Sequence, residues 1–245
     1  MTGTTTGTPM QPAGTGNRVL DGLSPEDAAR IGGHLERQVL AAGQILGPTG
    51  AENAAVLFPI GPAVVSVVAV CEDGRTAEAH SVGREGMLGP AIVRLPGLGH
   101  IQVQMPGQAL RIDLRTLEAL CAGSESLRVS IQSHDEAMMA RLVQSAICAS
   151  LHTVEARVSR WLLIAMERVG APELPVTQEL LSDLLGVRRT TVTRVMAQLT
   201  DKGLIRRRRS RVMVTDPTGL AQASCTCHTA MRDRLRRVAP VLYPD

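Results

Sequence analysis

Two neighbouring segments near the C-terminus repeat apolar residues with the spacing of an α-helix. The first lies between Thr177, a residue type that caps helix N-termini, and Gly186, which can adopt the left-handed conformation that ends a helix. Its apolar positions are Leu180, Leu181, Leu184 and Leu185. The second helix is expected to begin roughly three or four residues after Gly186. Its apolar positions, which fall within about 100° on a helical wheel, are Val192, Val195, Met196 and Leu199.

The polar face of this second helix carries side chains that can recognise DNA. It is formed by Arg189, Thr190, Thr193, Arg194 and Gln198. Arginine bonds bidentately to the O6 and N7 atoms of guanine, threonine can contact a thymine methyl group, and a helix fits the major groove. We expect Arg189, Thr190 and Arg194 to read bases. Contacts to the DNA backbone are expected from Arg188, Thr191 and Thr193.

A strongly basic hairpin is predicted directly after this helix, which ends at Gly203. The hairpin turns near Ser210, and its apolar positions are Leu204, Ile205, Val212 and Val214. The arginines on either side of the turn are Arg206, Arg207, Arg208, Arg209 and Arg211. Amphipathic helix pairs and solvated charge runs also occur in proteins that do not bind DNA. Five arginines in six positions favour a wing that contacts phosphates.

Between about residues 40 and 114 the pattern changes to short strands separated by turns. Ala63–Cys71 is rich in β-branched residues, Glu72–Gly74 contains the Asp-Gly hairpin signal, and Arg75–Val82 returns with alternating character. Frequent glycines and prolines mark further turns. This texture is typical of a compact β-barrel or jelly roll.

From Ser124 to about Cys148 glycine and proline are absent, and a long helix is predicted. Its apolar positions repeat about every 3.5 residues, which is the spacing of a coiled coil. We therefore expect a dimer interface formed by Leu127, Ile131, His134, Met138, Leu142, Ser145 and Ala149, with His134 and Ser145 as polar interruptions. The next helix, His152–Val169, is expected to begin the DNA-binding domain by packing Val154, Val158, Trp161, Leu162 and Ala165.

Composition and charge agree with a chain of more than one domain that binds nucleic acid. The 245 residues are 44% hydrophobic, which suffices for a core in each of two domains. Residues 153–245 contain sixteen Lys or Arg and nine Asp or Glu, which gives a net charge of +7, whereas residues 1–152 have a net charge of −4. The basic charge thus coincides with the helix pair and the wing. We predict an α+β protein with a disordered tail (1–17), a β jelly-roll sensor domain (18–123), a dimerisation helix (124–151) and a winged helix-turn-helix DNA-binding domain (152–245).

The sequence disfavours secreted proteins, membrane proteins and enzymes. Residues 1–17 lack the apolar core of a secretory signal, and no run of 18 apolar residues could span a membrane. Five cysteines, an odd number, without an export signal indicate reduced thiols in a cytoplasm. No Ser-His-Asp grouping, phosphate loop, paired carboxylate pattern or HExxH is visible, so an enzyme is not expected.

Cys225-Thr226-Cys227-His228 is the one local group with metal-ligand character. Its spacing is short and a fourth ligand is missing. On a helix beginning near Gly219 these side chains would diverge by about 100° per residue. A packing role is therefore favoured over metal binding or redox sensing. Cys121 and Cys148 are expected to be buried apolar fillers, and surface or packing roles are expected for His34, His80, His100 and His152.

Three strings of the sequence point to a known family. They are VSVVAVCEDGRTAEAHSVGREGMLG at 65–89, HTVEARVSRWLL at 152–163, and TQELLSDLLGVRRTTVTRVMAQLTDKGLI at 177–205. They resemble, in turn, the sensor barrel, the entry helix and the recognition unit of the Crp-Fnr superfamily of bacterial transcription regulators. The resemblance covers about residues 18–240. It implies a cyclic-nucleotide-binding-like jelly roll, a homodimer on two half-sites of a near-palindrome, and RNA polymerase as a partner.

The resemblance also bears on the operator. Cyclic-AMP-binding relatives begin the recognition helix with an Arg-Glu pair and place a second Arg four residues after the Glu. The matching positions here are Arg189, Thr190 and Arg194. Because Thr190 stands where those relatives have the acid, a different operator is expected.

The effector loop of such relatives is only partly present. Cyclic-AMP-binding relatives hold the phosphate with a Gly-Glu loop followed by an Arg-Ser pair, because a buried phosphate needs a charge-assisted partner. The Arg-Ser pair is absent here, so a cyclic nucleotide is only weakly indicated, and no cofactor or metal is assigned. The candidate effector loop consists of Arg84, Glu85, Gly86, Gly89 and Arg94. Iron–sulfur relatives use closely spaced cysteines near the N-terminus, whereas the first cysteine here is Cys71.

Two classes of function follow. The favoured one is a sequence-specific transcription regulator that binds double-stranded DNA as a homodimer and has a degenerate sensor domain. The alternative is a ligand- or redox-sensing signalling module that uses its winged helix for protein contacts. The basic wing argues against this alternative.

Overall fold

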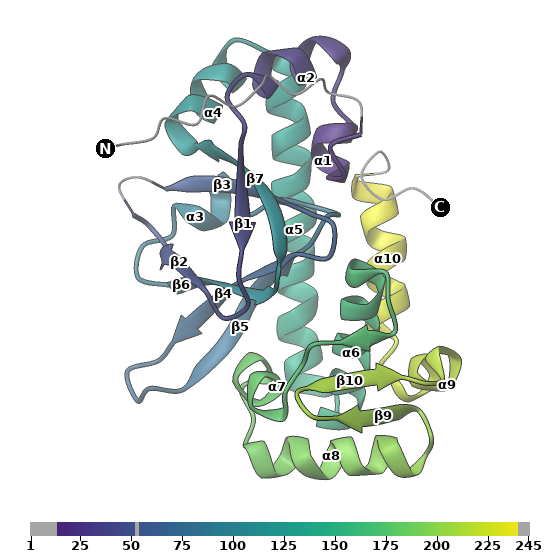
Figure 1. Cartoon of the computed structure of the whole chain (residues 1–245). Helices are drawn as coiled ribbons and strands as arrows, with labels where there is room; N and C mark the ends of the chain where they lie inside the picture. Colours follow the sequence, from purple (N-terminus) through teal and green to yellow (C-terminus); the bar gives the residue numbers. More distant parts are fainter. Residues whose placement is uncertain (1–13, 52–53, 240–245) are drawn as a thin grey trace.

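The computed structural model describes residues 14–51 and 54–239. Figure 1 shows a β-rich part, a long helix beside it, and a small mixed domain at the lower end of that helix. The predicted α+β architecture is confirmed. Among the residues that the structure describes, no helix has both the length and the apolar character needed to cross a membrane.

The β-rich part consists of two antiparallel sheets. One has the order β1 (Glu36–Leu40), β7 (Gly107–Asp113) and β3 (Ala55–Ile60). The other has the order β2 (Ile45–Pro48), β6 (Gly99–Met105), β4 (Val64–Val70) and β5 (Thr76–Val82). The predicted β4–β5 hairpin is confirmed, with Gly74 in the left-handed region (φ 80°). Leu57 of β3 packs with Val65 and Val67 of β4 in the buried core between the sheets, whereas Phe58 faces away from it and packs with Val19 and Leu127.

Short helices pack around the β-rich part. They are α1 (Arg18–Asp21), α2 (Pro25–Gly32), α3 (Pro90–Val93) and α4 (Leu114–Ala122). The predicted disordered tail ended at residue 17, but Asn17 is fully buried. Its amide donates to the carbonyl oxygens of Pro59 (2.9 Å) and Gly86 (2.8 Å), because a buried amide must find partners. Residues 1–13 of the predicted tail lie outside the described residues.

The long helix α5 (Glu125–Leu151) begins at a network of serines around a buried carboxylate. Ser124 caps the helix by accepting from the Leu127 N–H, and its hydroxyl donates to Asp27 of α2 at 2.6 Å. Ser126 donates to the same carboxylate at 2.6 Å. These hydrogen bonds stabilise the ionised form and lower the pKa of Asp27. They fix the start of α5 against the β-rich part.

The structure contradicts the predicted dimer interface on α5, because most of its residues are buried and not available to a second chain. Leu127, Ile131, His134 and Met138 are buried within the single chain, where they pack against the β-rich part and its short helices. Leu142 and Ser145 are half-buried, and Ala149 is exposed below the barrel. The face of α5 that remains exposed is instead formed by Val129, Met139, Val143, Ile147 and Leu151.

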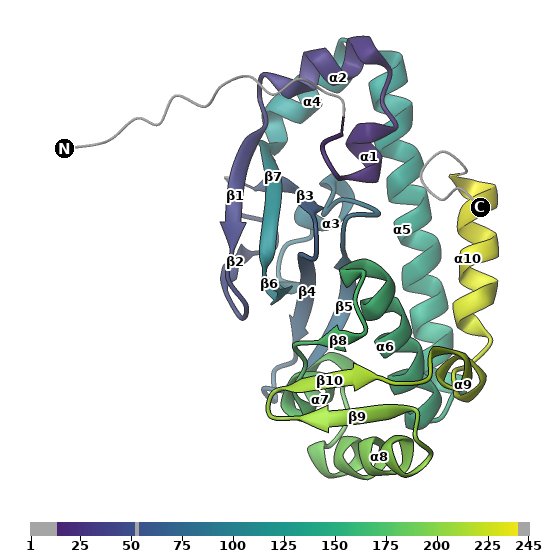
Figure 2. The ribbon, with the colours of Figure 1, turned by 45° about the vertical axis from the view of Figure 1, so that its right-hand side comes forward.

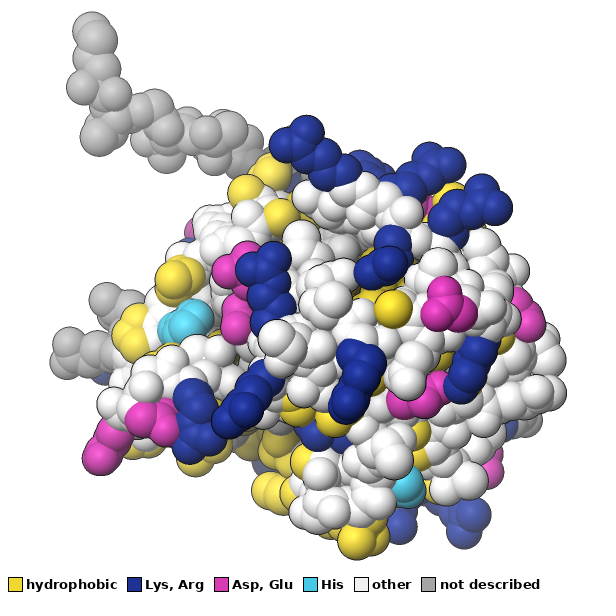
Figure 3. All heavy atoms as spheres, turned by 90° about the horizontal axis from the view of Figure 1, so that it is seen from below, with side chains coloured by type: hydrophobic (Ala, Val, Ile, Leu, Met, Phe, Trp, Pro, Cys, Tyr) yellow, Lys and Arg dark blue, Asp and Glu magenta, His cyan; other side chains and the backbone are white. Residues whose placement is uncertain are grey.

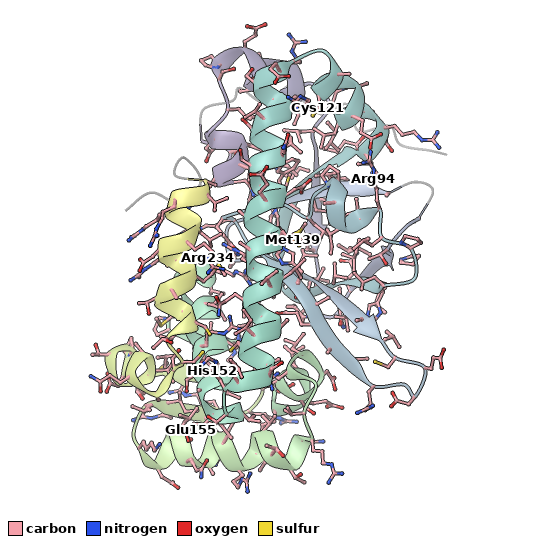
Figure 4. All side chains as sticks on the ribbon, turned by 180° about the vertical axis from the view of Figure 1, so that it is seen from behind. Arg94, Cys121, Met139, His152, Glu155 and Arg234 are labelled. Atoms are coloured by element: carbon pink, nitrogen blue, oxygen red, sulfur yellow. The ribbon has the colours of Figure 1, made fainter. Side chains whose placement is uncertain are left out.

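These exposed residues form the outer row of α5. At about 100° per residue they fall within roughly 120° of one another, on the opposite side of the helix from Leu127 and Met138. Met139, labelled in Figure 4, belongs to this row. Sequence periodicity finds apolar rows but does not say which row faces the chain's own core.

The elements of the small domain are α6 (Val154–Val169), β8 (Glu173–Leu174), α7 (Gln178–Leu185), α8 (Arg189–Asp201), β9 (Ile205–Arg208), β10 (Arg211–Val214) and α9 (Pro217–Ala223). The entry helix α6, the helix pair α7 and α8, and the β9–β10 wing lie where the sequence predicted them, whereas β8 was not predicted. The three strands form an antiparallel sheet in the order β8, β10, β9. Val158 and Leu162 of α6 pack with Val192, Met196 and Leu199 of α8 in one buried core.

The last helix, α10 (Cys227–Val238), returns to α5. Figure 2 shows the two helices side by side. Met231 and Leu235 of α10 join the buried cluster that contains Val19 and Leu127 of the N-terminal part. The predicted DNA-binding domain at 152–245 therefore includes a helix that packs with the other half of the molecule.

Candidate nucleic-acid interface

The helix α8 presents a polar face to solvent at the lower end of the molecule. Its apolar residues Val192, Val195, Met196 and Leu199 are buried, as the helical wheel predicted. Arg189, Thr190 and Arg194 are exposed on the other side. The structure thus brings together the three residues expected to read bases.

The turn between α7 and α8 holds this face in a fixed orientation. Thr177 caps α7 by accepting from the Leu180 N–H at 3.1 Å, and Gly186 ends it in the left-handed region (φ 62°). The Thr193 hydroxyl donates to Gln178 Oε1 at 2.8 Å, so it links α8 to the start of α7. Thr193 was expected to contact DNA backbone, and its hydroxyl proton is already used within the protein.

The first turn of α8 leaves backbone N–H groups open. Arg188 occupies the N-cap position in an extended conformation (φ −63°, ψ 138°), and its side chain makes no capping hydrogen bond. Helix N-termini carry unpaired N–H groups and a partial positive charge that attract phosphate. Arg188 and Thr191 lie at this end, where a phosphate contact is chemically suited.

The wing is a tight basic hairpin. Arg208 of β9 pairs with Arg211 of β10, and Ser210 in the turn adopts a left-handed conformation (φ 58°). Arg211 forms an ion pair with Glu173 of β8 at 3.3 Å. The other four wing arginines are exposed and form no ion pair with any residue that the structure describes: Arg206, Arg207, Arg208 and Arg209.

Viewed from below, this end of the molecule carries many cationic side chains (Figure 3). Exposed arginines without acidic partners keep their donors available for an external anion. The arrangement suits a polyanion that lies across α8 and the wing.

The candidate effector loop is packed against α5. The His134 Nε2 atom accepts from the Met87 N–H at 3.0 Å. A Cβ atom added at Gly86 would lie 2.6 Å from the same nitrogen. Arg94, which was grouped with this loop, instead forms an ion pair with Glu118 of α4. The loop residues therefore do not gather around an open phosphate site.

A cavity of about 480 Å³ lies between the β-rich part, α5, α6 and α10. Arg18, Arg84, Arg160 and Arg232 are among its lining residues. Glu85 borders it and binds the guanidinium groups of Arg141 (3.1 Å) and Arg168 (2.9 Å). His80 also lines it, and burial together with these two arginines holds the pKa of His80 well below its usual range. Of the candidate loop, only Arg84 and Glu85 face this cavity.

The cysteine motif is arranged differently from the expectation. A continuous helix from Gly219 would separate Cys225 from Cys227, but α9 ends at Ala223 and α10 begins at Cys227. The break lets both thiols turn inward, where they meet Cys148 and His152. His228 instead forms an ion pair with Glu167 at 3.1 Å. Burial raises the pKa of the Cys148 thiol to about 12, while the charge of Arg160 acts in the opposite direction.

Sequence inspection missed Cys148 and His152 as members of this cluster. Their spacing of four residues places them on one face of α5, which was an available signal. Nothing in the sequence showed that this face meets the segment around Cys225. Cys148 is fully buried in an apolar cluster, as predicted, and its sulfur lies within 4.8 Å of an imidazole nitrogen of His152 and of two other thiols.

Comparisons with known proteins agree with this geometry. Residues 156–223, from α6 to α9, match the Crp-like helix-turn-helix domain family. The chain has the Crp/Fnr regulator fold and carries a Crp-like helix-turn-helix domain. The matched residues include the string at 177–205 and most of the string at 152–163. A search of proteins with curated functions gives no match.

Several solved structures share the fold of about three quarters of the chain, which includes both the β-rich part and the small domain. A CRP-family transcriptional regulator from Thermus thermophilus is 19% identical with a TM-score of 0.63, covering 77% of this chain and 96% of that chain. FixK2 from Bradyrhizobium japonicum is 16% identical with a TM-score of 0.62, covering 78% and 98%. The c-di-GMP-responsive global regulator CLP from Xanthomonas campestris is 17% identical with a TM-score of 0.62, covering 78% and 99%.

Proposed function

We propose that this protein is a sequence-specific DNA-binding transcription regulator that acts as a homodimer on a near-palindromic operator. The observation that carries the proposal is the polar face of α8, where Arg189, Thr190 and Arg194 are exposed on a Crp-like helix-turn-helix domain. Such a face has the donors and dimensions that the major groove requires.

The two groups of cationic residues would have different tasks. Arg189, Thr190 and Arg194 would contact base edges and so determine the sequence that is bound. Arg188, Thr191 and the wing arginines would contact phosphates and so determine affinity and orientation. The N–H groups at the start of α8 support the phosphate contact, because no side chain caps them.

The dimer would form through the outer row of α5. Met139 (57% exposed) and Val143 (48% exposed) are apolar side chains near the middle of a 27-residue helix. The same row on a second chain, related by a two-fold axis, would cover them. Dimerisation matters because one recognition helix contacts too few base pairs to select a unique site.

A ligand of the sensor domain would occupy the arginine-lined cavity and not the candidate effector loop. Arg18, Arg84 and Arg160 supply positive charge there, so the cavity suits a small anion. The cavity also contacts α6, the first helix of the Crp-like domain. Contact with RNA polymerase stays a prediction from the family resemblance, and a cytoplasmic location stays a prediction from the five cysteines without an export signal.

Selection from a library of randomised duplexes tests the main proposal. The full-length protein at physiological salt should enrich a two-fold symmetric motif, with half-site centres about one helical turn apart. The variant Arg189→Ala/Arg194→Ala should enrich no motif while keeping its fold by circular dichroism. Binding without any sequence preference in the unmodified protein would reject sequence-specific regulation. Capture of a protein partner through an intact α8 in the absence of DNA binding would favour the signalling alternative.

A further inference from the structure

Four side chains with metal-binding atoms meet where α5 ends and α10 begins. Cys148 lies in the last turn of α5, His152 follows as its C-cap residue, Cys225 lies between α9 and α10, and Cys227 is the first residue of α10. The three sulfur atoms and one imidazole nitrogen all lie within 4.8 Å of one another. His152, labelled in Figure 4, marks the place at the lower end of α5.

The distances in this cluster fit a tetrahedral zinc ion. With Zn–S bonds near 2.3 Å and Zn–N bonds near 2.0 Å, tetrahedral geometry places two sulfur ligands roughly 3.8 Å apart and a sulfur and a nitrogen roughly 3.5 Å apart. The Cys148 and Cys225 sulfur atoms are 3.5 Å apart. The Cys227 sulfur and His152 Nδ1 are also 3.5 Å apart. The other pairs of ligand atoms lie within 4.8 Å of one another, so shifts of up to about 1 Å would bring all four atoms to coordination distance.

The surroundings of the cluster also fit a metal. All three cysteines are buried, and His152 is half-buried. Gln144 Nε2 donates to the Cys227 sulfur at 3.0 Å, a contact that resembles the outer-shell hydrogen bonds that orient thiolate ligands. Arg157 and Arg160 of α6 place positive charge near the thiols. That charge would offset the net −1 of one Zn²⁺ with three thiolates and a neutral imidazole.

We propose that Cys148, His152, Cys225 and Cys227 bind one Zn²⁺ ion per chain in a closed Cys₃His site. Three thiolates and one imidazole at these distances form one of the ligand sets of structural zinc sites, with no open position for catalysis. Binding converts three thiols to thiolates, releases their protons to solvent and changes no oxidation state. The ion holds the start of α10 against the end of α5.

The position of the site gives it a structural task. His152 is followed directly by Thr153, the cap of α6, so the ion lies where α5 passes into the Crp-like domain. Without the ion, packing contacts, weak thiol hydrogen bonds and the contact of His228 with Glu167 hold the segment around Cys225 and the first turn of α10. An effect of the metal on DNA affinity rests on the proposed function, whereas metal binding itself does not.

Metal analysis of the full-length protein tests the proposal without reference to DNA. Protein purified without a histidine tag, in a thiol-free reductant, should contain about one zinc per chain by mass spectrometry. After removal of zinc with a chelator, Co²⁺ titrated into the reduced protein should give visible d–d bands and near-ultraviolet thiolate charge-transfer bands that saturate at one equivalent. Absence of both zinc and these cobalt bands in the folded, reduced protein would overturn the proposal.

Single substitutions assign the ligands. Cys148→Ser, Cys225→Ser, Cys227→Ser and His152→Asn should each weaken Zn²⁺ binding more than about 100-fold, the upper end of the range for outer-shell changes. Gln144→Leu should weaken it only about 10-fold with the cobalt spectrum preserved. Cys121→Ser and His228→Asn are matched controls. Cys121 belongs to α4, near the end of α5 that is far from the cluster (Figure 4), and the His228 side chain contacts Glu167 instead of the thiols. If a control loses the metal as completely as a ligand variant, the assignment is wrong.

Two further measurements keep the test independent of variant folding and of the proposed function. Hydrogen exchange on the unmodified protein should show faster exchange across Cys227–Val238 after chelation, with the β sheets unchanged. Unchanged exchange there would contradict a site that holds α10 to α5. Mild oxidation that joins Cys148 to Cys225 in a protein unable to take up cobalt would identify a thiol pair instead and overturn the metal site. A protein that binds zinc but not DNA would contradict only the proposed function.

Discussion

The guanidinium group of Arg168 in α6 donates from Nε to Glu85 Oε1 of the β-rich part at 2.9 Å. It also donates to the Ser81 hydroxyl (2.9 Å) and the Ser81 carbonyl oxygen (2.8 Å). Arg141 of α5 donates to the same carboxylate oxygen at 3.1 Å. One buried carboxylate thus connects the β-rich part, the long helix and the first helix of the Crp-like domain.

Replacing this carboxylate should destabilise the protein. Burial by itself would raise the pKa of Glu85, but the charges of Arg168 and Arg141 outweigh it and hold that pKa well below its usual range. Glu85→Gln removes the charge of the carboxylate that two largely buried guanidinium groups share and should lower the free energy of unfolding by about 3 kcal/mol. Urea denaturation measures this change. Glu26→Gln, at an exposed ion pair with Arg30, should change it by less than about 0.5 kcal/mol.

Low pH should remove the stability that the ionised Glu85 carboxylate contributes. Because the folded-state pKa of Glu85 lies below the value of about 4.3 in the unfolded chain, the contribution is complete above that unfolded value and is lost as the pH falls below it. The difference in stability between the unmodified protein and Glu85→Gln should therefore shrink from pH 6 to pH 3. A constant difference over this range would mean that the carboxylate is not held ionised.

Substitution of Arg194 should change which sequence is bound. Arg194→Ala removes an exposed guanidinium from the polar face of α8 and should cost about 1–3 kcal/mol at each half-site, with relaxed preference at one base pair. Competition between matched and mismatched duplexes measures the preference. If the variant discriminates between the duplexes as well as the unmodified protein does, Arg194 does not read a base.

Substitution in the wing should weaken binding to every sequence alike. Arg208→Ala removes one exposed, unpaired guanidinium per chain, so the slope of log affinity against log salt should become shallower by about 0.9 for each phosphate that the variant no longer neutralises. Fluorescence anisotropy at several salt concentrations measures the slope. Arg115→Ala makes the same charge change on α4, at the opposite end of the molecule from α8, and should leave the slope unaltered (Figure 1).

The dimer should depend on the outer row of α5 and not on the buried row. Val143→Asp places a carboxylate in the proposed interface of each chain, and burying such unpaired charges should weaken association at least about 100-fold. Sedimentation at micromolar concentration measures this effect. Val39→Asp makes the same change at a 73% exposed residue of β1, across the β-rich part from α5, and should remain dimeric. A dimeric Val143→Asp protein would place the interface elsewhere.

Cyclic AMP should not stabilise the protein. The loop that resembles a phosphate site is packed against His134, and the Arg-Ser pair of cyclic-AMP-binding relatives is absent. A ligand present at one hundred times its Kd stabilises a folded protein by about 2.7 kcal/mol, which a thermal scan detects as a higher Tm. An unchanged Tm with cyclic AMP is expected. A saturable increase in Tm with cyclic AMP, abolished by His134→Ala, would show that the loop binds the nucleotide.

Local patterns predicted the Crp-like domain to within a residue or two. The capping Thr177, the left-handed Gly186 and the apolar row from Val192 to Leu199 act within one helix turn of their own positions, so the sequence contains all the information needed. The β4–β5 hairpin was predicted for the same reason, because its turn is local.

Predictions that depended on distant partners were less successful. The α5 helix has an apolar row toward the barrel, another outward and contacts with α10 at its side, so periodicity alone did not identify the exposed row. The cysteine cluster forms only because α10 packs beside α5, and no local sequence pattern predicts that contact. The Glu85–Arg168 contact likewise joins residues 83 positions apart in the sequence.

The hydrogen bond between Asp27 and Ser124 has a consequence for the order in which the chain folds. It closes a loop of 97 residues that contains every strand of the β-rich part, and closing so long a loop is entropically costly until those strands have paired. The first turn of α5 is therefore secured late, after the sheets have formed. During synthesis the β-rich part emerges first and can fold as a unit before α8 and the wing leave the ribosome. The basic face of the chain would then appear only on a molecule whose acidic half is already compact.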